Sequence, residues 1–157
     1  WAFAATSSTM VSNIIGQNLQ DKVIPLIVKI MKWSLGFAVM VFILLNVFAH
    51  QFLSIYGQGE EFMQEAIPVL RVVSVALLFM SIATVWLNAV TGTGNSSVNL
   101  AIEFVAIIIY IIYSYLTIEY YQLPITIGWM CEIIYWISLL LPSYWYIKSM
   151  KWKGLKI

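Results

Sequence analysis

Four long stretches of this 157-residue chain are apolar and almost free of charge, and they restrict the possible folds more than any other feature. They cover residues 33–55, 66–91, 98–118 and 125–147, and each contains at most one Asp, Glu, Lys or Arg. At about 1.5 Å per residue, a helix over any of them can cross a hydrocarbon core about 30 Å thick. We therefore expect four membrane-spanning helices.

The composition supports a membrane protein and excludes other classes. The chain is 62% hydrophobic and 10% charged, which leaves too few charged side chains to cover a water-soluble domain. Its net charge of +1 gives no basic surface for nucleic acid. The single cysteine, Cys131, excludes an internal disulfide and a cysteine-rich metal site. No nucleophile elbow, phosphate-binding loop or HExxH motif is present, so we expect neither an enzyme nor a bound metal.

The beginning of the chain is apolar but short. Residues 1–17 precede a polar run ending at Lys22 and are too few to span a membrane, so we interpret them as the second half of a membrane helix. The expected fold is all-α and transmembrane, with four full spans and one truncated N-terminal helix. Residues 1–157 then form a single partial domain whose cytoplasmic tail is 148–157.

The distribution of charge between the spans predicts the orientation. Basic residues favour the cytoplasmic side in short loops. Lysines occur before the first span and after the last, whereas the second and fourth connections carry only acidic charges; these residues are Lys22, Lys29, Lys32, Lys148, Lys151, Lys153 and Lys156, and Glu60, Glu61, Glu65 and Glu119. We expect both chain ends in the cytoplasm. Aromatic residues at the expected helix ends fit the interface with lipid headgroups: Trp33, Tyr56, Tyr120, Tyr121, Trp129, Trp145 and Trp152.

Polar residues recur at helical spacing within the apolar stretches. Such stripes indicate a face turned to protein or water, and a shared aqueous cavity is one interpretation. The alternative is that these side chains join helices by hydrogen bonds, and for the aromatic residues that they pack against neighbours. The candidate cavity-lining residues are Asn13, Ser81, Thr84, Asn88, Asn99, Tyr110, Trp129, Tyr135 and Trp136.

Two carboxylates lie inside expected spans and are candidates for ion coupling. An ionised group within a membrane is costly, so Glu103 and Glu132 should be paired or functional. Counting residues places Arg71 and Glu132 at the same depth, where they can form a structural ion pair. Glu103 has no cation at its own depth, although the side chain of Lys32 can extend toward it. Its charged form is therefore disfavoured in a dry cavity, as proton exchange requires.

Three segments together carry a family resemblance: Ala-Thr-Ser-Ser-Thr-Met-Val-Ser-Asn-Ile-Ile-Gly-Gln at 5–17, Asn-Ala-Val-Thr-Gly-Thr-Gly-Asn-Ser at 88–96, and Trp-Met-Cys-Glu-Ile-Ile-Tyr-Trp at 129–136. In this order and spacing they resemble the C-terminal lobe of the multidrug and toxic compound extrusion (MATE) transporters. The likeness covers nearly the whole chain, from the second helix of that lobe to the sixth.

The resemblance implies a 12-helix antiporter of two lobes in a bacterial inner (plasma) membrane. Such a protein exports organic cations or drug-like compounds in exchange for protons or sodium ions and needs no other cofactor. Its implied partners are the lipid bilayer, the N-terminal lobe and a small organic cation. Some members carry a carboxylate midway along the helix matching 66–91, but here that place falls near Met80. Coupling would then depend on the other lobe, on Glu103 or on Glu132.

Two other functions remain open from the sequence. A flippase for lipid-linked oligosaccharides would share the architecture, but it usually needs a more cationic cavity to hold pyrophosphate. A membrane subunit that only assembles with others would need no polar stripes.

Overall fold

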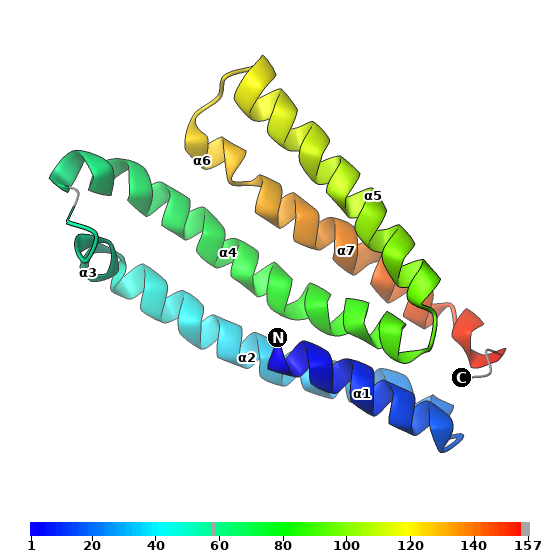
Figure 1. Ribbon diagram of the computed structural model, residues 1–157. Helices are drawn as coiled ribbons and strands as arrows, with labels where there is room; N and C mark the ends of the chain where they lie inside the picture. The colour runs from blue at the N-terminus through cyan, green and yellow to red at the C-terminus, as the bar shows by residue number, and fades with distance from the viewer. Residues whose placement is uncertain (58, 155–157) are drawn as a thin grey trace.

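The computed structural model describes residues 1–57 and 59–154, and its elements are helices joined by short turns (Figure 1). In chain order they are α1 (Ala2–Gly16), η1 (Gln20–Lys22), α2 (Val23–Val47), α3 (Ala49–Ser54), α4 (Gly59–Gly92), α5 (Ser96–Ser114), η2 (Tyr115–Tyr120), α6 (Ile125–Gly128), α7 (Cys131–Lys148) and η3 (Lys151–Gly154).

Among the residues that the structure describes, four helices are long and apolar enough to cross a membrane, namely Gln20–Val47, Gly59–Gly92, Ser96–Tyr120 and Ile125–Lys148. The short helix α1 precedes them. The fold class expected from the sequence, four spans and a short N-terminal helix, is thereby confirmed.

The first span differs from its expected bounds of 33–55. Helix α2 begins at Val23 and ends at Val47, and the chain bends at Phe48 before α3. The lysines Lys29 and Lys32 had been assigned to a loop, but they lie within the helix. A helix tolerates them because their aliphatic stems lie along apolar surface while the amines reach water.

The other spans are also bounded differently. Helix α4 begins at Gly59, seven residues before the expected start, and contains Pro68. Helix α5 continues into the π-helical turn η2, where the N–H of Tyr121 donates to the carbonyl of Leu116 at 2.9 Å. The expected helix 125–147 is interrupted between α6 and α7, whereas Pro142, where a kink was expected, lies inside α7, which remains helical up to Lys148.

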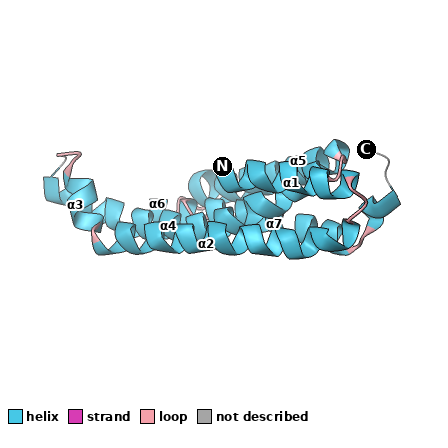
Figure 2. Ribbon diagram, turned by 90° about the horizontal axis from the view of Figure 1, so that it is seen from below, coloured by secondary structure: helices cyan, strands magenta, loops and turns pink. Residues whose placement is uncertain are grey.

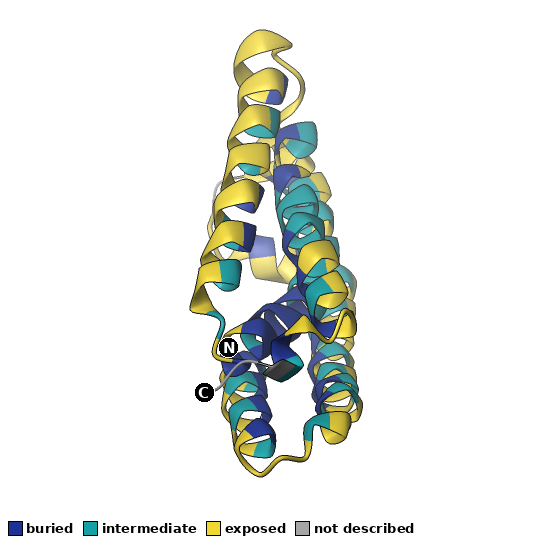
Figure 3. Cartoon of the chain, turned by 90° about the vertical axis from the view of Figure 1, so that its right-hand side faces the viewer, coloured by how far each residue is buried: buried dark blue, intermediate teal, exposed yellow. Residues whose placement is uncertain are grey.

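Helix α4 occupies the centre of the bundle. It packs against α2 on one side and α7 on the other, and these three helices form a layer. Helices α1 and α5 lie on the same face of this layer, with α1 over α4 and α2 and α5 over α7 (Figure 2). Buried residues face the inside of the bundle and exposed residues its outer surface (Figure 3).

The backbones of α1 and α4 approach closely where they cross. A Cβ atom at Gly92 would lie 2.6 Å from the carbonyl oxygen of Ser8, closer than real Cβ contacts allow. Nearby, the hydroxyl of Ser7 donates to the carbonyl of Val85 at 2.9 Å. Small residues at a crossing and a hydrogen bond across it are typical of membrane helix pairs.

The turn after α4 ends at Gly94 with φ +80°, and the side chain of Asn95 then accepts from the N–H of Val98 at the start of α5.

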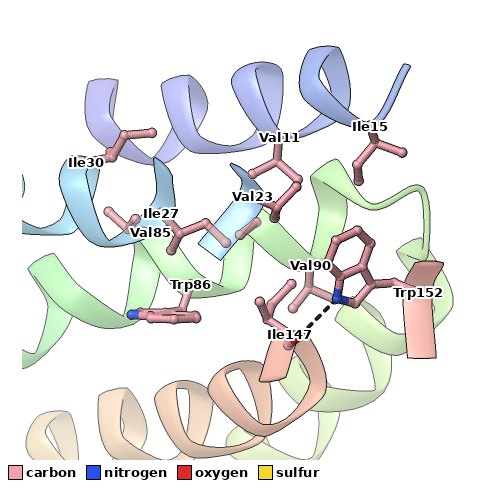
Figure 4. Packing of buried hydrophobic residues seen from close by; sticks show 11 residues of the cluster. Val11, Ile15, Val23, Ile27, Ile30, Val85, Trp86, Val90, Ile147 and Trp152 are labelled. Atoms are coloured by element: carbon pink, nitrogen blue, oxygen red, sulfur yellow. Dashed lines mark hydrogen bonds between the residues drawn. The ribbon is translucent and has the colours of Figure 1, made fainter. Parts of the chain in front are cut away.

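The largest buried cluster joins α1, α2, α4, the end of α7 and η3 (Figure 4). The indole of Trp152 is 1% exposed and donates to the carbonyl of Ile147 at 2.9 Å. The expectation that this ring lies at the membrane interface is therefore wrong. It fills the space between the chain ends instead, whereas Trp33 and Trp145 are 69% and 71% exposed.

The two kinds of connecting segment lie at opposite ends of the bundle (Figure 1). We call the end formed by η1, the α4–α5 turn and η3 the lysine-rich end, where the amine of Lys153 lies 2.7 Å from the carboxylate of Asp21. We call the end formed by α3, the start of α4, η2 and α6 the glutamate-rich end. This placement agrees with the alternation of charge along the chain.

Candidate functional site

A groove between α5 and α7 brings together three of the candidate residues. Tyr110 comes from α5, and Glu132 and Tyr135 come from α7; Ile107 and Ile111 complete the lining of a cavity of about 360 Å³. The rings of Tyr110 and Tyr135 meet edge to face with their centres 5.8 Å apart. The groove therefore combines one carboxylate with two phenols in apolar surroundings.

The interruption between α6 and α7 positions Glu132. Backbone hydrogen bonds tighten there, because the N–H of Glu132 donates to Trp129 and that of Met130 donates to Ile127, each three residues back. The hydroxyl of Tyr113 in α5 also donates to the carbonyl of Ile127 at 3.0 Å, which fixes α6 to α5. Glu132 thus lies in the first turn of α7, where the helix dipole favours a negative charge.

Two further cavities extend from this region toward the glutamate-rich end. The first, of about 310 Å³, shares Tyr110 with the groove and is also lined by Trp129 and Cys131. The second, of about 480 Å³, has Trp129 on one wall and Tyr56, Phe62 and Glu65 on the other. Trp129 therefore separates two spaces, and Trp136 packs against Tyr135 with ring centres 5.1 Å apart.

The expected ion pair between Arg71 and Glu132 is not formed. Within the described parts of the chain, no salt bridge joins these residues, and Arg71 is exposed. Residue counting gave them a similar depth but could not give the direction in which each side chain points. Glu132 faces the groove toward α5. The partial positive charge at the start of α7 stabilises its carboxylate, a role that Arg71 was expected to have.

Glu103 has a partner of a different kind from the expected lysine. The side-chain amide of Asn99, one turn earlier in α5, donates to its carboxylate at 2.9 Å. No salt bridge connects Glu103 to Lys32 or to another cation of residues 1–57 and 59–154. The amide oxygen of Asn99 is buried and has no hydrogen-bond partner.

Most of the polar stripe of α4 is hydrogen-bonded within α4 or to α2, and it does not line any of the three cavities. Ser81 and Thr84 are 8% and 7% exposed. The hydroxyl of Ser34 in α2 donates to the carbonyl of Ser81, while Thr84 and Asn88 donate to carbonyls within α4 itself. One turn from Arg71, Asn46 of α2 donates to the hydroxyl of Ser74. Ser34 and Asn46 were missed as partners, although both are polar residues in an apolar stretch.

The remaining candidate, Asn13, is exposed on α1, whereas Tyr110, Glu132 and Tyr135 lie between α5 and α7. The structure therefore does not gather all nine proposed cavity residues at one site. Among the residues described, no group of three His, Cys, Asp or Glu side chains is placed to hold a metal ion.

The candidate spans of the described residues define an integral membrane protein of the all-helical class. The MatE family model matches residues 1–116, which cover α1 to α5 and the start of η2. The chain therefore belongs to the MatE family, whose transporters are not enzymes. Glu103 lies inside the matched region and Glu132 beyond it. No curated protein and no solved structure was found to match the chain.

Proposed function

We propose that this protein exports organic cations or drug-like compounds by antiport with protons or sodium ions. The observation that carries the proposal is the MatE match over residues 1–116. The groove of Tyr110, Glu132 and Tyr135 supports it, because aromatic rings and a carboxylate attract cationic ligands in an apolar setting.

We further propose that the chain works together with an N-terminal lobe. Asn13 lies on an exposed face of α1, together with Thr6 and Thr9, whose hydroxyls donate to carbonyls of α1 itself. Polar groups at the depth of a membrane need protein or water beside them, and a second lobe around a central cavity would supply both.

The proposed location is a bacterial inner membrane with the lysine-rich end in the cytoplasm. Lysines at one end and glutamates at the other support this orientation, since basic residues favour the cytoplasmic side. Single cysteines at Gln122 and at Ser149, in a Cys131→Ser background, test it. Only the first should react with an impermeant thiol reagent outside intact cells, and the reverse pattern would invert the orientation.

A pyrophosphate-carrying substrate is less well supported. The groove is lined by one carboxylate, two phenols and two isoleucines, so a polyanion would meet a negative charge there.

The decisive experiment expresses the complete protein in bacteria that lack their own drug exporters. Cells should accumulate less of a fluorescent organic cation than cells with an empty vector, and dissipation of the ion gradients should remove the difference. Glu103→Gln should reach the same membrane level but lose ion-coupled export; Glu119→Gln, on the η2 turn, is the matched control and should export normally. Equal accumulation with and without the protein would contradict the proposal.

A further inference from the structure

The strongest unexplained feature is the unsatisfied amide of Asn99. Its nitrogen donates to the carboxylate of Glu103 at 2.9 Å, whereas its oxygen is buried and accepts no hydrogen bond from the described chain. Buried polar atoms are rarely left without a partner, because they lose their hydrogen bonds to water and gain none in return.

The pair has too many acceptors and too few donors. An ionised carboxylate only accepts hydrogen bonds, and an asparagine amide offers one acceptor and two donors. In this arrangement a negative charge and a free amide oxygen lie one helical turn apart on α5, and the amide nitrogen is the one donor observed between them. What the pair lacks is a further hydrogen-bond donor or a cation.

Among the residues that the structure describes, the helices packed against α5 do not supply a positive charge. On α7, Tyr135 and Glu132 line the groove beside α5, but one is a phenol and the other a carboxylate. Lys148 ends α7, where its amine lies over the ring of Tyr144. On α4 the ionisable residues are Glu60, Glu61, Glu65 and Arg71, all in the first half of the helix, whereas α5 starts beside the end of α4.

We propose that Asn99 and Glu103 form a binding site for one small monovalent cation, a proton or a sodium ion. The proposal rests on the antiport function above and names the site of its coupling ion. Without the cation, the amide nitrogen donates to the carboxylate, as observed. When Glu103 gains a proton, the amide turns over, and the new carboxylic O–H donates to the Asn99 oxygen. A sodium ion is instead coordinated by that oxygen and the carboxylate together.

In neither orientation do both polar atoms of the Asn99 amide have a hydrogen-bond partner. The amide therefore changes easily from one orientation to the other. In the observed orientation the oxygen has no partner, and after a half-turn the nitrogen takes its place. The charge on Glu103 therefore decides which orientation is preferred. Asn99 is a positioning residue, because the orientation of its amide depends on whether Glu103 holds a cation.

Infrared difference spectroscopy on the complete protein in lipid nanodiscs tests the site without any transport measurement. With isotope-labelled asparagine, lowering the pH should produce a carboxylic-acid signal and a change in an asparagine amide signal together. Glu103→Gln should abolish both signals, whereas Glu132→Gln should retain them. Asn99→Leu should keep the carboxylic-acid signal, moved to a different pH midpoint, and lose the amide response.

A second arm separates the two cations. At a fixed pH where Glu103 is ionised, sodium chloride is compared with equal potassium and choline chloride. A sodium-specific change in the Glu103 and asparagine signals assigns the site to sodium, and a response to pH alone assigns it to the proton. An asparagine signal that responds to neither, or that persists in Glu103→Gln, would overturn the proposal.

The outcomes also distinguish this proposal from the function on which it rests. Export by the complete protein without any response at Asn99 would count against the site alone. A clear infrared response in a protein that exports no organic cation would count against the proposed function and leave the site standing.

Discussion

The two ends of the bundle differ in how well they are packed, although both are rich in large apolar residues. At the lysine-rich end Val11, Ile27, Ile147 and Trp152 are at most 1% exposed. At the glutamate-rich end Tyr56, Phe62, Ile125 and Trp129 line cavities and are 37% to 66% exposed. Burial therefore follows the arrangement of the helices and not the hydrophobicity of the residues.

The length of the helices explains the difference. Helix α4 has 34 residues, about 51 Å, whereas α1 has 15 residues, about 22 Å, and packs beside the second half of α4. At that end α1, α2, α4, α7 and η3 meet in one cluster (Figure 4). The first half of α4 is covered by fewer elements.

The largest expected effect comes from removing the indole at the centre of the dense end. Trp152→Ala should lower the free energy of unfolding by about 3–5 kcal/mol, because it leaves a cavity and removes the hydrogen bond from the indole to the carbonyl of Ile147. Trp145→Ala is the matched control, since that ring is 71% exposed, and should cost less than about 1 kcal/mol. Unfolding by denaturing detergent in mixed micelles measures both, and equal losses would show that the two ends do not differ in packing.

A smaller effect is expected where α1 crosses α4. Gly92→Ala places a methyl group against the backbone of Ser8 and should cost about 1–3 kcal/mol, since the helices must move apart. Gly36→Ala in α2 has open space around it and should change stability by less than about 1 kcal/mol, toward greater stability. The same unfolding measurement applies, and a Gly92→Ala protein as stable as Gly36→Ala would mean that the crossing is not tight.

At the hollow end one hydrogen bond is expected to matter. Tyr113→Phe removes the donor to the carbonyl of Ile127 and should cost about 1 kcal/mol. The loss should be local, so amide hydrogen exchange should rise in α6 while the lysine-rich end is unchanged. Tyr115→Phe, whose ring is 58% exposed, is the control. Faster exchange throughout the bundle would show that the two ends unfold as one unit.

The sequence was sufficient for the number of spans and for the end to which each connection belongs. Hydropathy and charge determine those features directly. The start of α2 could not be found in this way, because Lys29 and Lys32 look the same in a loop and at a membrane surface. The interruption at Trp129 and Met130 was also missed, and the hydrogen bond from Tyr113 to Ile127 beside it joins residues fourteen apart in the chain.

The candidate site was predicted only in part. Periodicity shows that Ser81 and Glu132 lie on particular helix faces, but it does not show which neighbour covers each face. Ser81 meets Ser34, whereas Glu132 opens onto a groove with Tyr110. Glu103 was singled out for lacking a cation at its depth, and the structure describes none bound to it. Its partner Asn99 was recognisable as a neighbour at helical spacing, but the unsatisfied amide oxygen required coordinates.

The smallest effect is expected from the ion pair that ties η3 to η1 at the dense end. Asp21 lies in η1, ahead of the first residue of α2. A hydrogen bond from Lys153, together with its charge, holds the pKa of Asp21 below its ordinary value of 3.8. Because the pKa of Asp21 is lower in the folded protein than in the unfolded chain, ionised Asp21 stabilises the fold at pH values above the pKa of the unfolded chain. This contribution disappears as the pH falls below about 3.8 and through the lowered pKa of the folded protein.

Because the Asp21 side chain is 94% exposed, salt should also weaken the pair. Thermal unfolding of the wild-type protein and Asp21→Asn should therefore show a small difference at pH 7 in low salt that vanishes in acid or in high salt. A difference that persisted under both conditions would show that Asp21 stabilises the dense end by something other than its charge.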